Sequence, residues 1–112
     1  MIDRGKYIEV VIGAAVLRGP DFVEVLVSAL DRFGAKPLLV LCDSPAGNVG
    51  TMEAYSTGVE LASRVRSRVA IVLGGREPTE LDRLTDLVAG NRGGEVRSFR
   101  DLPAARKWLM VD

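Results

Sequence analysis

Small and polar residues follow two unbroken apolar segments, 38–42 and 69–73, and these are the residues whose types and positions could support binding. An apolar run without alternation is typical of a strand that is buried on both faces of a parallel sheet. Loops at the carboxyl ends of such strands are where open α/β sheets bind ligands. We therefore take these residues as binding-loop candidates: Asp43, Ser44, Gly47, Asn48, Gly74, Gly75 and Arg76.

The composition excludes several kinds of catalytic site. The chain contains no histidine, so a Ser-His-Asp triad or a Cys-His pair cannot be assembled, and the commonest metal ligand is missing. Cys42 is the single cysteine, which excludes a closed zinc site of the usual type. Any catalysis would rest on carboxylates, lysine, tyrosine or a borrowed cofactor. We predict no catalytic residue, no metal site and no cofactor, and a protein that is not an enzyme.

The glycine-containing loops do not complete a known catalytic or phosphate-binding motif. The segment 43–49 looks superficially like the oxyanion-hole loop of Clp-type serine proteases, but no serine follows Gly75, and the residues that acyl transfer needs are absent. Gly74-Gly75-Arg76 lacks both the Gly-Lys-Ser/Thr ending and the Gly-x-Gly-x-x-Gly spacing. The first predicted strand has no acidic pair, which excludes a receiver domain.

Length and charge limit the class of protein further. A chain of 112 residues corresponds to one domain, residues 1–112, with enough buried surface for a core. Fifteen basic and fifteen acidic residues cancel, so we expect no nucleic-acid partner. The longest mostly apolar run, 7–17, is too short for a membrane-spanning segment. One cysteine and no recognisable leader indicate a cytoplasmic protein.

The order of predicted elements indicates an α/β fold. Strands are expected at 7–12, 38–42, 69–73 and 95–99, the last at a sheet edge, with helices after each of them. The first helix should follow a turn at 18–21 and end at Gly34, and the second should run from Thr51 to about Arg66. The third should open at Glu77-Pro78 and end at Gly90, and Asp101 should cap the fourth. We predict a small, mostly parallel or mixed sheet of four to five strands flanked by about four helices.

Apolar spacing assigns a face to each predicted helix. Gly58 is expected to permit close packing of another element, and Gly13 to interrupt the first strand, which 14–17 could continue. Arg64, Arg66 and Arg68 are interpreted as a solvated edge in preference to an anion site. The residues grouped on one face of each helix are Phe22, Leu26, Leu30 and Phe33; Met52, Tyr55, Val59 and Ala62; Leu81, Leu84 and Val88; and Leu102, Ala105, Trp108 and Leu109.

Three local patterns of this chain resemble the STAS superfamily, and within it the SpoIIAA-like branch of small bacterial proteins. The first is Gly13 with Gly19-Pro20-Asp21-Phe22 opening a helix, and the second is an apolar strand that ends in Asp43. The third and most specific is the closing segment 98–109, in which a phenylalanine and a capped helix precede Trp108-Leu109. The resemblance covers nearly the whole chain and implies a small sheet flanked by helices.

The resemblance also implies a mode of regulation. In better studied members a serine at the start of the helix after the central strand is phosphorylated by a partner kinase. Their Asp-Ser-Ser-Gly pattern is absent here, so Thr51 and Ser44 are the phosphorylation candidates. A phosphate at a helix N-terminus is favoured by the helix dipole, but a role as N-cap explains Thr51 equally well.

Two functions of different classes remain open at this point. The first is a protein-interaction or regulatory module that acts through the loop 43–51, with a protein partner or a homodimer as its assembly. The second is a small apolar-ligand or lipid-binding domain, which the resemblance also permits. Cys42 and Trp108 are interpreted as core residues in both cases.

Overall fold

The structure is a computed structural model that describes residues 1–12, 19–42, 51–73 and 78–110, except the side chains of residues 19–21, 51, 53 and 81. The described residues form a five-stranded sheet in the order β1–β2–β3–β4–β5. β1 runs antiparallel to β2, and the other neighbouring pairs are parallel. The predicted fold class is confirmed. The strands are β1 Ile2–Asp3, β2 Ile8–Ile12, β3 Leu38–Cys42, β4 Val69–Val72 and β5 Val96–Phe99.

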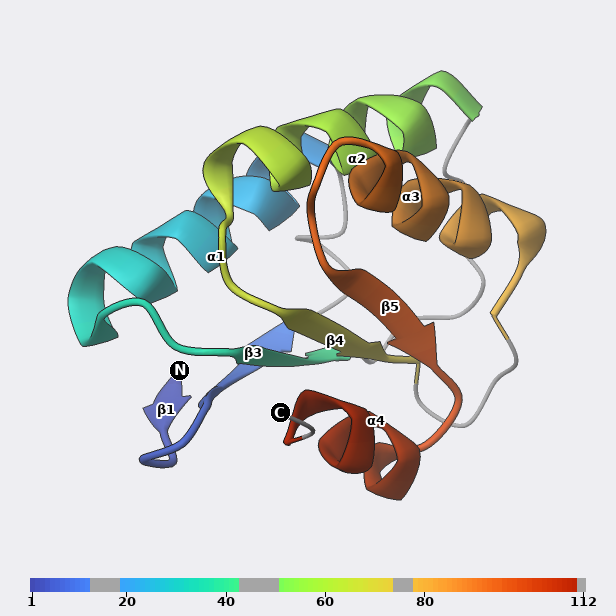
Figure 1. Cartoon of the computed structure of the whole chain (residues 1–112). Helices are drawn as coiled ribbons and strands as arrows, with labels where there is room; N and C mark the ends of the chain where they lie inside the picture. The colour runs from blue at the N-terminus through green and yellow to red at the C-terminus, as the bar shows by residue number, and fades with distance from the viewer. Residues whose placement is uncertain (13–18, 43–50, 74–77, 111–112) are drawn as a thin grey trace.

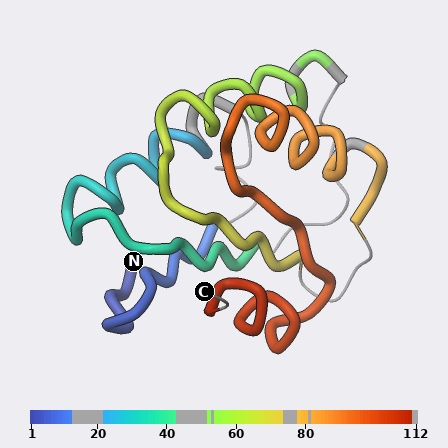
Figure 2. Tube along the Cα trace, viewed as in Figure 1, coloured from blue at the N-terminus to red at the C-terminus, as the bar shows by residue number. Residues whose placement is uncertain are grey.

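The described helices cover the two faces of the sheet unequally (Figure 1). α1 (Gly19–Phe33), α2 (Thr51–Arg64) and α3 (Glu80–Asn91) lie on one face, and α4 (Leu102–Leu109) lies on the other. Figure 2 shows the chain passing through α1, α2 and α3 on the same side before it crosses to α4. This is the arrangement expected when successive parallel strands are added in one direction with crossovers of one hand.

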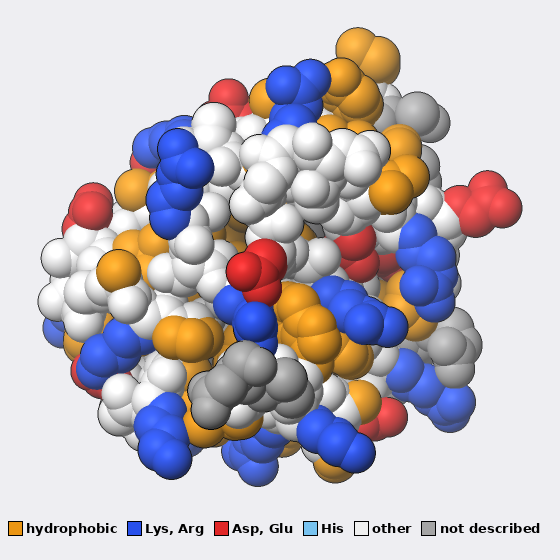
Figure 3. All heavy atoms as spheres, viewed as in Figure 1, with side chains coloured by type: hydrophobic (Ala, Val, Ile, Leu, Met, Phe, Trp, Pro, Cys, Tyr) orange, Lys and Arg blue, Asp and Glu red, His pale blue; other side chains and the backbone are white. Residues whose placement is uncertain are grey.

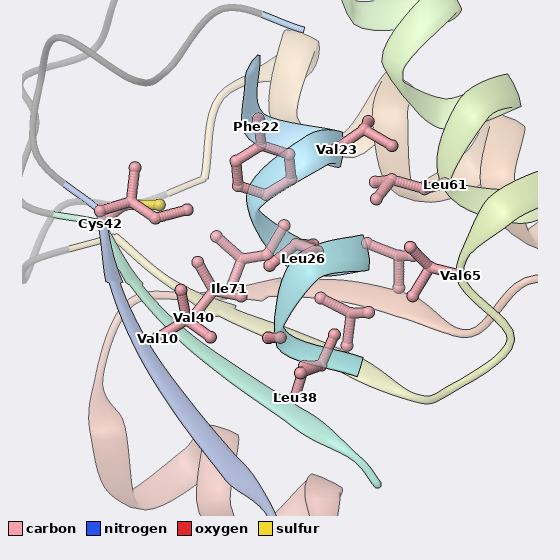
Figure 4. Packing of buried hydrophobic residues seen from close by; sticks show 14 of the residues in the cluster. Val10, Phe22, Val23, Leu26, Leu38, Val40, Cys42, Leu61, Val65 and Ile71 are labelled. Atoms are coloured by element: carbon pink, nitrogen blue, oxygen red, sulfur yellow. The ribbon is translucent and has the colours of Figure 1, made fainter. Parts of the chain in front are cut away.

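The larger core lies between the sheet and helices α1 to α3. Val10, Val40 and Ile71 come from three neighbouring strands and lie beneath Leu26 of α1 (Figure 4). The alternate strand residues point to the opposite face, since successive side chains of a strand alternate, and there a second core forms under α4. Strands with apolar contacts on both faces account for the continuous apolar runs in the sequence.

Two predicted helix boundaries are confirmed by backbone geometry. Gly34 follows α1 with a φ of +91°, and its N–H donates to the carbonyl of Leu30 at 2.8 Å. This is the left-handed stop that glycine provides without steric cost. Asp101 precedes α4, and its carboxylate accepts the N–H of Ala104 at 2.9 Å, as an N-cap does.

The predicted start of α3 was wrong. The helix opens at Glu80, so Pro78 lies before its cap and not in its first turn. Thr79 is the N-cap, and its N–H donates to the Asp82 carboxylate at 2.8 Å while the Asp82 N–H donates back to the Thr79 hydroxyl. This capping box satisfies the first amides of the helix without proline.

The predicted end of α3 was also wrong. Gly90 lies inside the helix, which continues to Asn91. The glycine with a left-handed backbone is Gly93, at a φ of +89°, and the N–H of Gly94 donates to the carbonyl of Ala89 at 2.8 Å. Of the glycines in this region, Gly93 takes the left-handed conformation that ends the helix, and the N–H groups of Gly93 and Gly94 donate to carbonyls of its last turn.

β1 was not predicted from the sequence. Gly5 has a φ of +91°, and the Arg4 N–H donates to the Tyr7 carbonyl at 2.9 Å, which closes a turn at Arg4-Gly5. The turn brings Ile2 opposite Glu9 at the edge of the sheet. A strand of two residues is too short to produce a hydrophobic pattern in the sequence.

Candidate functional site

The binding-loop candidates lie outside the described residues. Their ranges are 43–50, with Asp43, Ser44, Gly47 and Asn48, and 74–77, with Gly74, Gly75 and Arg76. The proposed strand continuation at 14–17 also lies outside. Thr51 is the first residue of α2, as predicted, but its side chain is not described. Its roles as cap or phosphorylation site, and that of Ser44, stay predictions.

The strand ends that precede these ranges are described, and they share one edge of the sheet. Ile12 is paired with Cys42, and Leu41 is paired with Val72. Because β2, β3 and β4 are parallel, the chain leaves each of them at the same carboxyl edge. Both candidate loops therefore start at the edge where open α/β sheets bind ligands.

A row of apolar residues crosses the sheet next to this edge on the side of α4. Val11, Leu41, Val72 and Phe99 are successive partners in register. Val72 is 7% exposed, Leu41 is half-buried and Val11 is 64% exposed. Exposure rises along the row with distance from α4, which packs on β4, β3 and β5. The helix covers one half of this face and leaves the other half open.

We call the uncovered part the open half-face and define it by Ile2, Val11 and Leu41. Ile2 is 47% exposed and lies on this side because it is paired with Glu9, the residue two before Val11. Parallel strands are normally covered by helices on both faces. Within the described chain, α4 is the helix on this face, and β1 and β2 extend beyond it.

Charged residues border the open half-face. Glu9 is buried, and its carboxylate accepts a hydrogen bond from the Arg4 guanidinium at 3.1 Å. In α4 the Trp108 ring lies 5.6 Å from that of Phe99, on the flank toward β5. Arg106, two residues earlier on a helix of 3.6 residues per turn, is exposed on the flank of α4 opposite Trp108.

The predicted inward face of α2 was wrong for two of its four residues. Met52 is 77% exposed and Tyr55 is 43% exposed. The helix buries Ala54, Leu61 and Ala62. Small residues on this side let α3 approach closely, so the larger apolar side chains are left outside.

Gly58 is the contact point between α2 and α3, as predicted. A Cβ at this position would lie 2.8 Å from the carbonyl oxygen of Thr85 and 2.9 Å from the Cβ of Val88. The Thr85 hydroxyl also donates to the carbonyl of Ala54 at 3.0 Å. Met52 and Tyr55 of α2 and Leu87 of α3 are exposed apolar side chains of this helix layer, and the Tyr55 hydroxyl accepts a hydrogen bond from the Arg92 guanidinium at 3.2 Å.

Asp86 is a partly buried carboxyl group that ties α3 to β5. It accepts the backbone N–H of Ser98 at 2.8 Å and the Ser98 hydroxyl at 3.1 Å. Burial raises the pKa of Asp86 to about 6, although the hydrogen bonds from Ser98 act in the opposite direction. The Ser98 N–H is an edge-strand donor, so Asp86 also closes that position of the sheet edge.

The three arginines after α2 do not converge on a common site. Arg64 forms an ion pair with Glu24, which raises the pKa of Arg64 and lowers that of Glu24. Arg68 donates to Glu95 at 2.9 Å and to the Trp108 carbonyl at 3.1 Å. Arg66 is exposed. The predicted solvated edge is confirmed for Arg66, whereas the other two join elements of the fold.

The predicted core roles of Cys42 and Trp108 are confirmed. Cys42 is buried at the end of β3. Trp108 packs against Phe99 and lies under the guanidinium of Arg68, 5.2 Å from the ring centroid. Among the described residues no group of three or more cysteine or carboxylate side chains is placed to hold a metal ion. None of the described helices is long and apolar enough to span a bilayer.

Comparison with known proteins identifies no relative: no family model, no curated protein and no solved structure matches the chain. Function is therefore inferred from the site itself. The open half-face was missed by sequence reasoning, and β2 carries no signal that would have found it. Glu9 points to the same face as Val11, yet Glu9 is itself buried.

Proposed function

We propose that the chain is a non-catalytic protein-interaction module whose partner contacts the carboxyl edge of the sheet and the open half-face. The observation that carries this proposal is the 64% exposure of Val11, which is paired with Leu41 on one side and lies beyond the end of the two-residue β1 on the other. Such a residue in a parallel strand is normally covered. An exposed apolar surface with a charged border is typical of an interaction site.

The chemistry of the chain favours binding over catalysis. There is no histidine to act as a general base near neutral pH. Asp86 has a raised pKa, but both of its oxygens accept hydrogen bonds from Ser98. Its environment is explained by the packing of α3 on β5. A catalytic carboxyl group would instead be directed into a cleft.

We extend the proposal to the SpoIIAA-like branch of the STAS superfamily, and with it to a cytoplasmic bacterial protein. The mixed sheet and the Asp101-capped last helix with Trp108 support this assignment. A regulatory protein would then be the partner, and phosphorylation at Thr51 or Ser44 would control its binding. The loop 43–51 starts beside the open half-face, so one partner can contact both.

Native mass spectrometry of the protein purified from the cells that make it tests this function. We expect a mass excess that equals a polypeptide and is lost on denaturation. Val11→Arg should remove it, whereas Ser28→Arg, an exposed position on α1, should retain it. A lost excess of a few hundred daltons would instead identify a small apolar ligand, and an excess unaffected by Val11→Arg would contradict the proposed surface.

The same spectra test the regulatory part of the proposal. One phosphate corresponds to a mass excess that survives denaturation, and fragmentation assigns it to a residue. We expect it at Thr51 or Ser44. A phosphate confined to any other residue would contradict the assignment.

A further inference from the structure

β5 is the outermost strand of the sheet on the side away from β1, so its outer edge has no neighbouring strand among the described residues (Figure 1). The Leu73 N–H donates to the Phe99 carbonyl at 2.9 Å. Backbone groups of successive strand residues point to alternate sides, so Arg97 and Phe99 are turned toward β4. The N–H and C=O groups of Val96 and Ser98 therefore point away from the sheet.

An outer edge of this kind is a template for pairing with a strand of another chain. The two edges of this sheet differ in length. β1 has two residues, and a very short edge strand is protected because it offers little to pair with. β5 has four residues, so its edge is the one at which another form of protection matters.

The side chain of Asp86 occupies the outward N–H of Ser98. Asp86 lies on α3, and its carboxylate accepts that N–H at 2.8 Å and the Ser98 hydroxyl at 3.1 Å. The N–H is thereby withheld from the carbonyl of an incoming strand. An ionised carboxylate has no donor of its own, and its charge repels a carbonyl oxygen that approaches the same position.

A gain in stability does not explain why this position carries a carboxylate. Burial raises the pKa of Asp86 to about 6, so at neutral pH the charged form is less favourable in the fold than in the unfolded chain. The hydrogen bonds from Ser98 offset part of this cost. A buried charged group that does not add to stability is consistent with a role in specificity.

We propose that Asp86 is an edge guard, which keeps β5 of one copy from pairing with β5 of a second copy. The inference goes beyond the proposed function and does not depend on the open half-face. In an antiparallel pair of β5 strands related by a two-fold axis, the Ser98 N–H of each copy would donate to the carbonyl of the partner's Val96. Asp86 withholds this donor in both copies.

Charged side chains along β5 act in the same direction. Arg97 lies between the two outward residues, so in the two-fold pair it would face the partner's Arg97, and like charges in opposite positions are destabilising. Figure 3 shows lysine and arginine side chains around the surface that β5 and α4 form. Such charges discourage pairing of identical edges, whereas Asp86 removes a backbone donor that the pairing requires.

Asp86→Ala removes the guard and leaves the Ser98 N–H unpaired at the edge. In sedimentation velocity at roughly 100 µM we expect this variant to form a dimer, with self-association at least about tenfold stronger than that of the wild type. The measurement is made at about 500 mM salt, where repulsion between the arginines is screened. A two-fold pair uses the β5 edge of both copies, so this contact should not extend beyond a dimer.

Two further variants assign the association to the edge. Asp86→Asn keeps an oxygen that can accept the Ser98 N–H and should associate no more than the wild type. Asp86→Ala combined with Ser98→Pro removes the N–H itself, which takes no part in the ladder with β4, so the fold should remain and the dimer should be lost. Circular dichroism checks that each variant is folded. If Asp86→Ala unfolds, Asp86→Leu repeats the test with a side chain that accepts nothing and retains apolar packing.

Hydrogen exchange of the wild type, followed by NMR, tests the guard without any substitution. The Ser98 N–H should exchange at least about 100-fold more slowly than in the unfolded chain, although it lies on the sheet edge. Exchange at the unfolded rate would overturn the inference. So would a folded Asp86→Ala or Asp86→Leu variant that associates no more than the wild type, or an association that persists with Ser98→Pro.

Discussion

The two faces of the sheet differ in how completely helices cover them. On the face of α1, α2 and α3, Val10 and its partners Val40 and Ile71 are buried. On the face of α4, Val11, the next residue of the same strand, is 64% exposed. Adjacent residues of one strand thus differ in their surroundings: Val10 lies in the core, and Val11 is exposed on the surface. Substitutions on the face of α1, α2 and α3 should therefore lower the free energy of unfolding, whereas substitutions at Val11 should leave it nearly unchanged and affect binding.

The largest effect is expected from a pair of truncations, one on each face. Leu26→Ala removes a fully buried side chain of α1 and should lower the free energy of unfolding by about 3 kcal/mol, because it leaves a cavity. Val11→Ala should lower it by less than about 0.5 kcal/mol, as for exposed positions. Urea unfolding of both variants measures the difference. Equal losses would mean that the second face is covered in the free protein.

Asp86 should make the free energy of unfolding depend on pH. Its pKa is about 6 in the fold and near 4 in the unfolded chain, so the folded state holds the proton more strongly between these values. The free energy of unfolding should therefore fall as pH rises from about 4 to about 6, by about 2 to 3 kcal/mol. Asp82 raises this pKa further, whereas Arg83 and the hydrogen bonds from Ser98 lower it.

Asp86→Asn is the control for this titration, since its amide oxygen can still accept the Ser98 N–H. Thermal unfolding of wild type and variant between pH 4 and 7 gives the difference attributable to Asp86. We expect the wild type to lose more stability than Asp86→Asn across this window. Parallel pH profiles of the two proteins would show that Asp86 does not titrate there.

Two glycines on the helices of the covered face should respond in opposite directions. Gly58→Ala places a Cβ 2.8 Å from the Thr85 carbonyl oxygen and should destabilise the fold by about 2 kcal/mol through overpacking. Gly90→Ala has no atom within 4 Å of the new Cβ and should stabilise α3 by about 0.5 to 1 kcal/mol. Denaturant unfolding distinguishes them. A destabilising Gly90→Ala would indicate that Gly90 ends the helix after all.

The smallest effect belongs to the cap of α4, the helix that half covers the second face. Asp101→Ala removes the acceptor of the Ala104 N–H and should cost about 1 kcal/mol. Asp101→Asn retains an acceptor and should cost less. If both variants unfold at the wild-type urea concentration, the cap contributes nothing to the attachment of α4.

The buried strands and most helices could be predicted from the sequence because their signals are local and repeated. The runs 38–42 and 69–73 have no polar interruption, and Asp101 is a cap residue before an apolar repeat. The face of α2 could not be predicted in this way. Spacing groups Met52 with Tyr55 but does not say that Gly58 and its small neighbours are the side that packs.

The incomplete cover of the second face also could not be read from β2 alone. The strand is apolar apart from Glu9, and its exposure depends on how far α4 reaches across the sheet. That reach is set by tertiary packing, through contacts of Ala105 and Leu109 over β3, β4 and β5. Residues that lie far apart in the sequence decide it, so a local pattern carries little information about it.

Site-specific photo-crosslinking in the cells that make the protein tests the central claim most directly. A photoreactive amino acid replaces Val11 in one variant and Ser28, an exposed residue of α1, in another. We predict polypeptide adducts at position 11, of a second copy or of a different protein, and few or none at position 28. Equal adducts at the two positions, or none at position 11, would contradict the assignment of the open half-face as an interaction surface.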